Sequence, residues 1–407
     1  MQPQLPARQA YLDWLRIFAI IGVLFFHSAM PYVAEWSWHI KNKETSHVLL
    51  EFNDFAHRFR MPLLFFISGT VSYYMLQRRS GGGFIGLRVR RLLVPLLLGM
   101  LVIVPPQVYM ERLTQGFKGN FLNFYQQMFT TGAYPKGNLS WHHLWFICYL
   151  LVYDIVFAPF FVWLISSRGK AFVLKMNWIA NGKWIYLLMV PGVLVYTFMV
   201  LKFPQTGDLV HDYAYLPYWL FYVLAGFICI ANPAFMDSLE RNRRTSLMIA
   251  FASILFINYL RWNKLEPWMI FDDFKQVPAT YFFMAISAIC AWMWVFAIVG
   301  YGKKYLNKQS PVLSYINEAV YPFYILHQTV IVLITYYLVQ TSDGIGLKYS
   351  FTVIVTFIIS MGIFHLFIRP YGVMRFLFGM KSRQPAVKQP AAEEALPLIT
   401  SPQPATA

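Results

Sequence analysis

About ten long apolar stretches run through the 407-residue chain, and they constrain its fold more than any other sequence feature. A helix that crosses a bilayer needs roughly 20 mostly apolar residues. Lipid cannot satisfy the hydrogen bonds of an open backbone, so these stretches must be helical. The spans are expected at approximately 14–34, 61–77, 92–110, 144–165, 184–201, 213–231, 246–262, 279–299, 319–338 and 350–368. We therefore predict an all-α integral membrane protein with about ten transmembrane helices around a central cavity.

The overall composition supports a chain that uses lipid as part of its solvent. Hydrophobic residues make up 58% of the chain and charged residues only 13%, whereas a soluble domain carries about 25% charged residues. A disordered chain is excluded, and a soluble globular enzyme is disfavoured. All three cysteines, Cys148, Cys229 and Cys290, lie in apolar runs, which excludes a disulfide scaffold and a cysteine-based metal site.

The basic residues are distributed unevenly over the connections between spans. The loops after even-numbered spans and the C-terminal tail hold most of the Lys and Arg, while most acids lie in the other loops. The positive-inside rule then places both termini in the cytoplasm. The net charge of +16 is thus mainly a topology signal, and no nucleic-acid partner is predicted. Residues 1–380 are expected to form the membrane domain, and 381–407, rich in Pro and Ala, a disordered cytoplasmic tail.

The first span carries two ionisable side chains on one helical face. Arg16 and His27 are eleven residues apart, which at 100° per residue is three turns plus about 20°, or about 16 Å along the axis. Ionisable groups inside a membrane are costly and usually face the bundle interior. Arg16 either snorkels to the interface or has a chemical task. An imidazole titrates near neutral pH, so we predict that His27 acts as a general base.

A second polar cluster, formed by Asn53, Asp54, His57 and Arg60, precedes the second span on the external side. On a helix, Asn53 and His57 are four residues apart and Asp54 and His57 three apart, so these side chains can touch. The pattern fits either a site in which Asp54 orients His57 or an amphipathic interface helix with a solvated charged face.

Within the second span, Ser68 and Gly69 are adjacent small residues. Small residues allow neighbouring helices to approach closely in a membrane. We predict such a close contact here rather than a nucleophilic serine, because no nucleophile-elbow motif surrounds Ser68.

Three further groups are candidates for binding substrate. Arg88, Arg90 and Arg91 at the cytoplasmic mouth of the third span could hold phosphates by charge-assisted hydrogen bonds, or they could anchor the chain to anionic lipid.

The other two groups are aromatic and histidine-rich. His143 and Trp145 at the external start of the fourth span belong either to an interfacial aromatic belt or to a sugar-stacking surface. Tyr324 and His327 in the ninth span either line the same cavity or simply pack. His142 and His143 are adjacent and do not share a helix face, so we predict no metal site.

Several of these motifs together resemble the acyltransferase-3 family of integral membrane acyltransferases. The resemblance runs from about Tyr11 to Phe378 and is most specific in the first 70 residues. It rests on Arg16-x10-His27, on Phe52-Asn53-Asp54-Phe55-x-His57-x-Phe59-Arg60-Met61 with Phe65-Phe66 and Ser68-Gly69, and on His143-Leu144-Trp145-Phe146 and Tyr324-x-x-His327.

The resemblance implies a function and assigns roles. It implies a donor, acyl-CoA (succinyl-CoA or acetyl-CoA), on the cytoplasmic side, a glycan hydroxyl as the external acceptor, and no tightly bound cofactor. It also implies a place in the bacterial inner membrane. Arg16 and His27 would be the active pair. The remaining expected site residues are His57 and Asp54 for catalysis, Arg88, Arg90 and Arg91 for the donor, and Asn53, Arg60, His143, Trp145, Tyr324 and His327 for substrate.

An alternative from another functional class is a proton-coupled transporter of a small anion or an acylated glycan, with Arg16 and His27 in the proton path. Transporters often contain Gly- or Pro-broken helices paired between two related halves. Pro191, Pro217 and Pro322 show no such pairing, which favours the acyltransferase.

Overall fold

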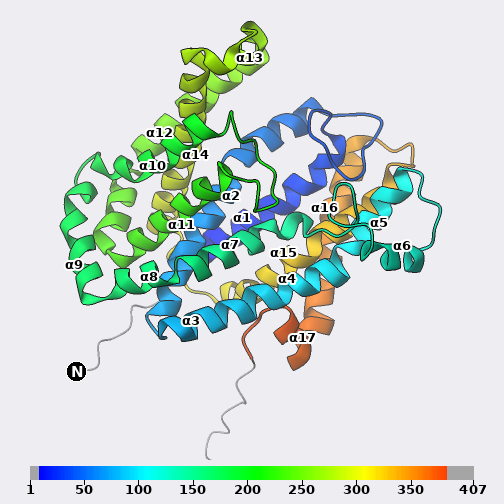
Figure 1. Ribbon diagram of the computed structural model, residues 1–407, viewed down its shortest axis with the longest axis horizontal. Coiled ribbons are helices and arrows are strands. Elements are labelled where there is room, and N and C mark those ends of the chain that lie inside the picture. Colours follow the sequence, from blue (N-terminus) through cyan, green and yellow to red (C-terminus); the bar gives the residue numbers. More distant parts are fainter. Residues whose placement is uncertain (1–8, 383–407) are drawn as a thin grey trace, which may run out of the picture.

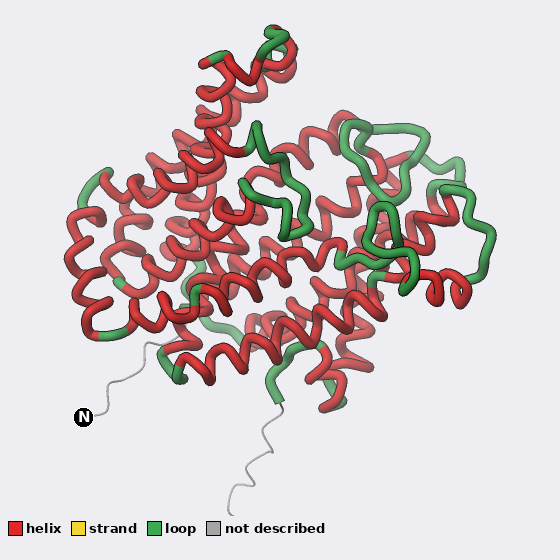
Figure 2. The backbone as a smooth tube through the Cα atoms, in the orientation of Figure 1, coloured by secondary structure: helices red, strands yellow, loops and turns green. Residues whose placement is uncertain are grey.

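The computed structural model describes residues 9–382, and this part of the chain is helical without a β-strand (Figure 2). Short 3-10 or π-helical turns lengthen or join the α-helices. The α-helices are α1 (Ala10–Ala29), α2 (His47–Leu76), α3 (Gly81–Arg88), α4 (Val94–Leu98), α5 (Pro105–Thr114), α6 (Phe121–Met128), α7 (Trp145–Val156), α8 (Ala158–Ile165), α9 (Ser167–Lys175), α10 (Val190–Met199), α11 (Tyr215–Ala231), α12 (Pro233–Trp262), α13 (Pro267–Ile270), α14 (Pro278–Tyr305), α15 (Pro311–Leu338), α16 (Ile345–Ile363) and α17 (Gly372–Leu377). The turns are η1 (Met30–Tyr32), η2 (Val89–Leu93), η3 (Gly99–Ile103), η4 (His142–Leu144), η5 (Met176–Ala180), η6 (Trp184–Met189), η7 (Phe274–Gln276) and η8 (Phe364–Ile368).

Each of the ten predicted spans coincides with a helix or a run of joined helices, so the predicted fold class is confirmed. In the described chain, six continuous segments are long and apolar enough to cross a bilayer: Ala10–Tyr32, Gly81–Thr114, Pro233–Ile270, Pro278–Tyr305, Pro311–Leu338 and Ile345–Ile368. The pair His142–Val156 and Ala158–Ile165 forms a seventh crossing that is bent by 59°. The shorter apolar helices Trp184–Met199 and Tyr215–Ala231, together with α2, correspond to the remaining predicted spans.

The bend between α7 and α8 has a local cause in the sequence. Pro159 lies in the first turn of α8. Proline has no backbone N–H, so the helix cannot continue its hydrogen-bond ladder through this position. The fourth predicted span is therefore one crossing made of two differently directed helices.

Both ends of the described chain lie on one side of the helix bundle (Figure 1). We call this side, which carries α3 and α17, the terminal face. Loop 33–46 and α6 lie on the other side, which we call the opposite face. Chain ends on the same side are what an even number of crossings produces.

Two glycines set the closest helix contact, between α2 and α11. A Cβ atom added to Gly69 would lie 2.0 Å from the carbonyl oxygen of Val223, and one added to Gly226 would lie 1.9 Å from that of Phe66. No side chain fits at either position, so the two backbones touch directly. The predicted close packing at Ser68–Gly69 is confirmed.

Candidate active site

A cavity of about 680 Å³ extends from the terminal face into the bundle. It reaches inward as far as Phe146 and Tyr324, and its volume falls within the roughly 300–1,000 Å³ typical of small-molecule sites. Basic side chains predominate among the charged groups of its lining. The lining contains Arg16, Arg88, Arg91, Arg375 and Lys381 against one acid, Glu318. The cavity is therefore suited to an anionic ligand.

The single acid of this lining is already neutralised. The Glu318 carboxylate forms ion pairs with Nη1 of Arg375, at 2.6 Å, and with Nε of Arg369, at 3.2 Å. A buried or half-buried carboxylate held by two guanidinium groups adds little negative potential to the cavity. The residues that line the cavity therefore carry a net positive charge.

Arg16 lies where the sequence predicted, on α1 and facing the bundle interior. Its Nη2 donates to the backbone carbonyl of Asn317 on α15 at 3.2 Å and also to the Asn317 side-chain oxygen. The guanidinium is half-buried and lines the cavity. The side chain therefore points into the cavity, and a chemical task for Arg16 stays a prediction.

The three basic residues of the predicted donor site differ in their surroundings. Arg88 is buried and forms an ion pair with Asp154 of α7, whose other oxygen accepts a 2.7 Å hydrogen bond from Ser72. Arg90 is exposed, and its guanidinium lies over the Phe376 ring, outside the cavity lining. Arg91 lines the cavity. Arg88 thus has a structural partner, and Arg91 is the best placed of the three for a ligand.

His27 and His327 form a pair between α1 and α15. Nδ1 of His27 lies 2.9 Å from Nε2 of His327, and the two rings are parallel within 6°. Nδ1 of His327 lies 2.6 Å from the Tyr324 carbonyl oxygen, which can only accept a hydrogen bond. In a neutral His327 ring, Nδ1 therefore carries the proton and Nε2 accepts from His27 Nδ1–H. This tautomer leaves Nε2 of His27 with a lone pair, which is what a general base requires.

The other predicted residues of the fourth and ninth spans divide into two groups. The His143 ring packs edge-on against His327 with centroids 5.3 Å apart, and the Tyr324 hydroxyl donates to the His143 carbonyl. His143, Tyr324 and His327 therefore gather beside His27. Trp145 instead packs against Tyr149, with centroids 5.2 Å apart, within an aromatic cluster. The structure does not place Trp145 among the histidines.

The polar cluster on α2 is only partly arranged as predicted. The Asp54 carboxylate accepts a 2.8 Å hydrogen bond from Arg58 and lies 3.9 Å from Arg261. Its charged partners are thus two guanidinium groups rather than the His57 ring. His57 packs instead against the ring of Trp36, at a centroid distance of 5.2 Å. The roles predicted for Asp54 and His57 stay predictions.

Asn53 and Arg60 are buried beside the C-terminal end of α1. Nδ2 of Asn53 donates to the Phe26 carbonyl at 3.3 Å, and the Arg60 guanidinium lies 3.2 Å from the Phe26 ring centroid. Oδ1 of Asn53, Nε and Nη1 of Arg60, and Nε1 of Trp38 are buried without a hydrogen-bond partner. Leaving such a group unsatisfied costs about 1–3 kcal/mol. Unpartnered donors and an acceptor next to His27 are suited to receive a polar substrate.

Lys41, in the loop after α1, is already used by the protein. Its ammonium group donates to the backbone carbonyls of Met30, at 3.1 Å, and Val33. Burial lowers the pKa of this amine. Carbonyls at the end of a helix favour a cation, so Lys41 holds the end of the first span in place.

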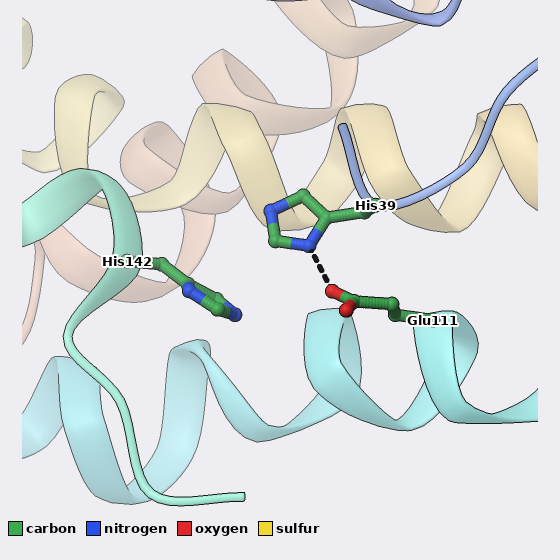
Figure 3. Close-up of side chains that lie close together, drawn as sticks. All are labelled: His39, Glu111 and His142. Atoms are coloured by element: carbon green, nitrogen blue, oxygen red, sulfur yellow. Dashed lines mark hydrogen bonds and ion pairs between the residues drawn. The ribbon is translucent and has the colours of Figure 1, made fainter. Parts of the chain in front are cut away.

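Sequence reasoning missed one cluster on the opposite face, made of His39, Glu111 and His142 (Figure 3). Nδ1 of His39 lies 2.5 Å from Oε2 of Glu111, and the His39 and His142 rings have centroids 4.5 Å apart. The three residues come from a loop, from α5 and from η4. No local spacing connects them, so only the isolated acid Glu111 at the end of an apolar span gave a signal.

Comparisons with known proteins identify the family of this chain. The acyltransferase-3 family profile, described as an acyltransferase domain, matches residues 9–365. Glucans biosynthesis protein C of Salmonella schwarzengrund (strain CVM19633) is 25% identical over 396 residues, which cover 94% of this chain and 96% of that protein. The same-named protein of Salmonella agona (strain SL483) is 24% identical over 408 residues, with the same coverage. No solved structure matches the chain. The predicted resemblance is confirmed, and this chain belongs to the acyltransferase-3 family of integral membrane acyltransferases.

Proposed function

We propose that this acyltransferase moves a succinyl or acetyl group from acyl-CoA, bound from the cytoplasmic side, to a hydroxyl of an extracytoplasmic glycan. The observation that carries the proposal is the His27–His327 hydrogen bond. It leaves a lone pair on His27, whose partner His327 packs against Tyr324 at the inner end of the basic cavity, with ring centroids 5.7 Å apart. A ligand that enters the cavity from the terminal face would therefore end near the His27–His327 pair.

The donor fits the cavity by charge and shape. Coenzyme A carries phosphates on a long, flexible pantetheine arm that ends in the thioester. Arg91 and Lys381 at the terminal face would receive the phosphates through charge-assisted hydrogen bonds. The arm would extend towards Tyr324. Arg16, inside the cavity, is placed to stabilise negative charge on the donor or to receive a succinyl carboxylate. The basic character of the loops on this side supports a cytoplasmic orientation.

The acceptor is supported by the relatives and by the opposite face. The similar proteins are named for glucans biosynthesis, which supports a glucan as the acceptor. The unpartnered polar atoms of Trp38, Asn53 and Arg60 lie on the side of His27 that faces away from the cavity's basic mouth. Carbohydrate hydroxyls both donate and accept hydrogen bonds, so they would satisfy these groups.

The chemical step is a direct acyl transfer. Nε2 of His27 takes the proton of the acceptor hydroxyl, and that oxygen attacks the thioester carbonyl carbon. The new C–O ester bond forms as the C–S bond breaks, and the CoA thiolate leaves with the proton returned by His27. His327 accepts the hydrogen bond from the His27 Nδ1–H throughout and so keeps the imidazolium oriented, as a positioning residue.

The proposal is tested with purified protein in vesicles. Labelled succinyl-CoA or acetyl-CoA is supplied on one side and glucan on the other, and both CoA release and labelled glucan are measured. Positioned proton transfer typically contributes about 10²–10⁴-fold. The His27→Ala variant should therefore lose at least about 100-fold in turnover while it binds acyl-CoA.

The exposed histidine His211, which pairs with Asp208 in a loop, provides the control. The His211→Ala variant should turn over at the wild-type rate. Full activity of His27→Ala would refute the assignment of the base, and failure to consume thioester in the presence of any glucan would refute the donor and acceptor.

A further inference from the structure

We propose that His39, Glu111 and His142 form a binding site for a divalent transition-metal ion, with Zn²⁺ as the ion that fits best. The site goes beyond the proposed acyl transfer, which needs no metal. The two proposals are therefore tested independently of each other.

The three side chains already converge without an ion. One ligand atom from each lies within 4.8 Å of the others, and Figure 3 shows the His142 ring directed towards the other two side chains. Two imidazoles and one carboxylate form a ligand set known from catalytic zinc sites, in which water or substrate takes the fourth position. Zinc bonds of about 2.0–2.2 Å in a tetrahedron separate ligand atoms by about 3.3–3.6 Å. Small side-chain movements therefore suffice to seat the ion.

His142 provides an independent observation that points to a ligand. Its Nε2 is buried and has no hydrogen-bond partner. Its Nδ1 lies 3.0 Å from the Ser140 hydroxyl oxygen, which also accepts the backbone N–H of His142 at 3.0 Å. With Nδ1–H donating to Ser140, the lone pair is on Nε2, inside the cluster. Metal-binding histidines typically donate their second ring N–H in this way.

Glu111 brings a carboxylate that is held by hydrogen bonds. It is 4% exposed, and its Oε1 accepts from the Tyr134 hydroxyl at 2.9 Å and from Gln115 at 3.2 Å. The neighbouring Arg112 is directed to Asn138 and to backbone carbonyls. A buried carboxylate with such hydrogen-bond support is a suitable ligand for a cation.

His39 can change from its present hydrogen bonds to metal binding. Its Nδ1 now donates to Glu111, and its Nε2 lies 3.2 Å from Nε2 of Gln328. When Nδ1 binds an ion, the proton moves to Nε2, which then needs an acceptor. The Gln328 amide supplies one by a half turn that exchanges its nitrogen for its oxygen. Gln107, whose Oε1 now accepts from Gln328 Nε2 at 3.1 Å, must turn with it so that its own amide donates to Gln328. His39 lies in loop 33–46, outside the helices, so it can move by the small distance required.

Zinc binding to the purified full-length protein tests the proposal. Bound zinc is measured by atomic emission, and affinity by competition with a chromophoric chelator. The wild type should bind one Zn²⁺ per chain, and millimolar Mg²⁺ should not displace it because Mg²⁺ prefers oxygen ligands. Loss of an outer partner alone costs about 10–100-fold in affinity. Glu111→Gln and His142→Gln should therefore lose at least about 100-fold, and Tyr134→Phe about 10-fold or more.

The His211→Gln variant is the matched control. His211 also forms a histidine–carboxylate pair, at 2.7 Å from Asp208, but it is not part of the three-residue cluster. This variant should bind zinc as the wild type does. The proposal is wrong if the wild type binds no zinc, or if Glu111→Gln and His142→Gln bind it equally well.

A second variant guards against a folding defect. The His142→Cys variant keeps a zinc ligand at this position, and with Co²⁺ it should show the thiolate-to-cobalt absorption that the wild type lacks. Absence of this band in a protein that melts like the wild type would overturn the role of His142 as a ligand.

Discussion

His327 is predicted to act on catalysis only through His27. The His327→Leu variant removes the acceptor of the 2.9 Å hydrogen bond from His27 Nδ1. When His27 takes up a proton in the transition state, this bond becomes charge-assisted, and such bonds contribute about 1.5–3 kcal/mol. Since each 1.36 kcal/mol of activation free energy changes the rate tenfold, kcat should fall by about 13- to 160-fold.

Measuring kcat and KM separately distinguishes the loss of a positioning residue from general damage to the fold. His327 is not among the residues that line the donor cavity, so the KM for acyl-CoA should stay near its wild-type value. The His327→Gln variant retains an amide oxygen that can accept from His27 and should recover part of the lost kcat. Steady-state kinetics in vesicles, with acyl-CoA varied at saturating glucan, measures both constants.

A matched control on the same helix is Thr335→Val. Thr335 is fully buried on α15, and its hydroxyl has no hydrogen-bond partner, so this change alters the packing of α15 without breaking a bond. Its kcat should match the wild type. The reasoning is refuted if His327→Leu keeps more than half of the wild-type kcat, or if Thr335→Val loses as much as His327→Leu.

Two further predictions concern the donor cavity and the helix packing. Arg91→Ala should raise the KM for acyl-CoA about tenfold or more, because a hydrogen bond to a charged group contributes about 1.5–3 kcal/mol. Arg90 is outside the cavity lining, so Arg90→Ala should leave this KM unchanged. Equal KM values for the two variants would exclude Arg91 from the proposed donor site. Gly69→Ala should lower the free energy of unfolding by about 1–3 kcal/mol, because the new Cβ overpacks against Val223. Gly22→Ala is the control: nothing lies within 4 Å of its new Cβ, so the free energy of unfolding should not fall. Melting curves in detergent check this pair, and a Gly69→Ala protein as stable as the wild type would contradict the close contact.

The number and order of the membrane helices followed from the sequence because lipid imposes a simple rule. A stretch of about 20 apolar residues has only the helix available to it in a bilayer. The first span, for example, was expected at 14–34 and is the helical segment Ala10–Tyr32. The bend at Pro159 was missed, although proline is a strong local signal. A bend does not change the apolar length of a span, so hydropathy alone cannot reveal it.

From the sequence alone, the relative positions of candidate site residues could be worked out only where the residues share one helix. Arg16 and His27 lie on the same face of α1, about three turns apart, and both face the interior of the bundle. The partner of Arg88 was not predictable, because Asp154 is 66 positions away and the pairing depends on how α3 and α7 pack. The local i,i+3 rule suggested His57 for Asp54, whereas the folded chain offers it Arg58, four residues further along α2, and Arg261 from α12.

One face of α15 connects the parts of the site. Asn317, Tyr321, Tyr324 and Gln328 are separated by four, three and four residues, so they lie along a single stripe. The first three line the donor cavity, and Gln328 contacts His39 on the way to the opposite face. His327, next to this stripe, holds His27. Under the proposed function, a thioester arriving along α15 from the terminal face would end at Tyr324, which packs against His327, the partner of His27.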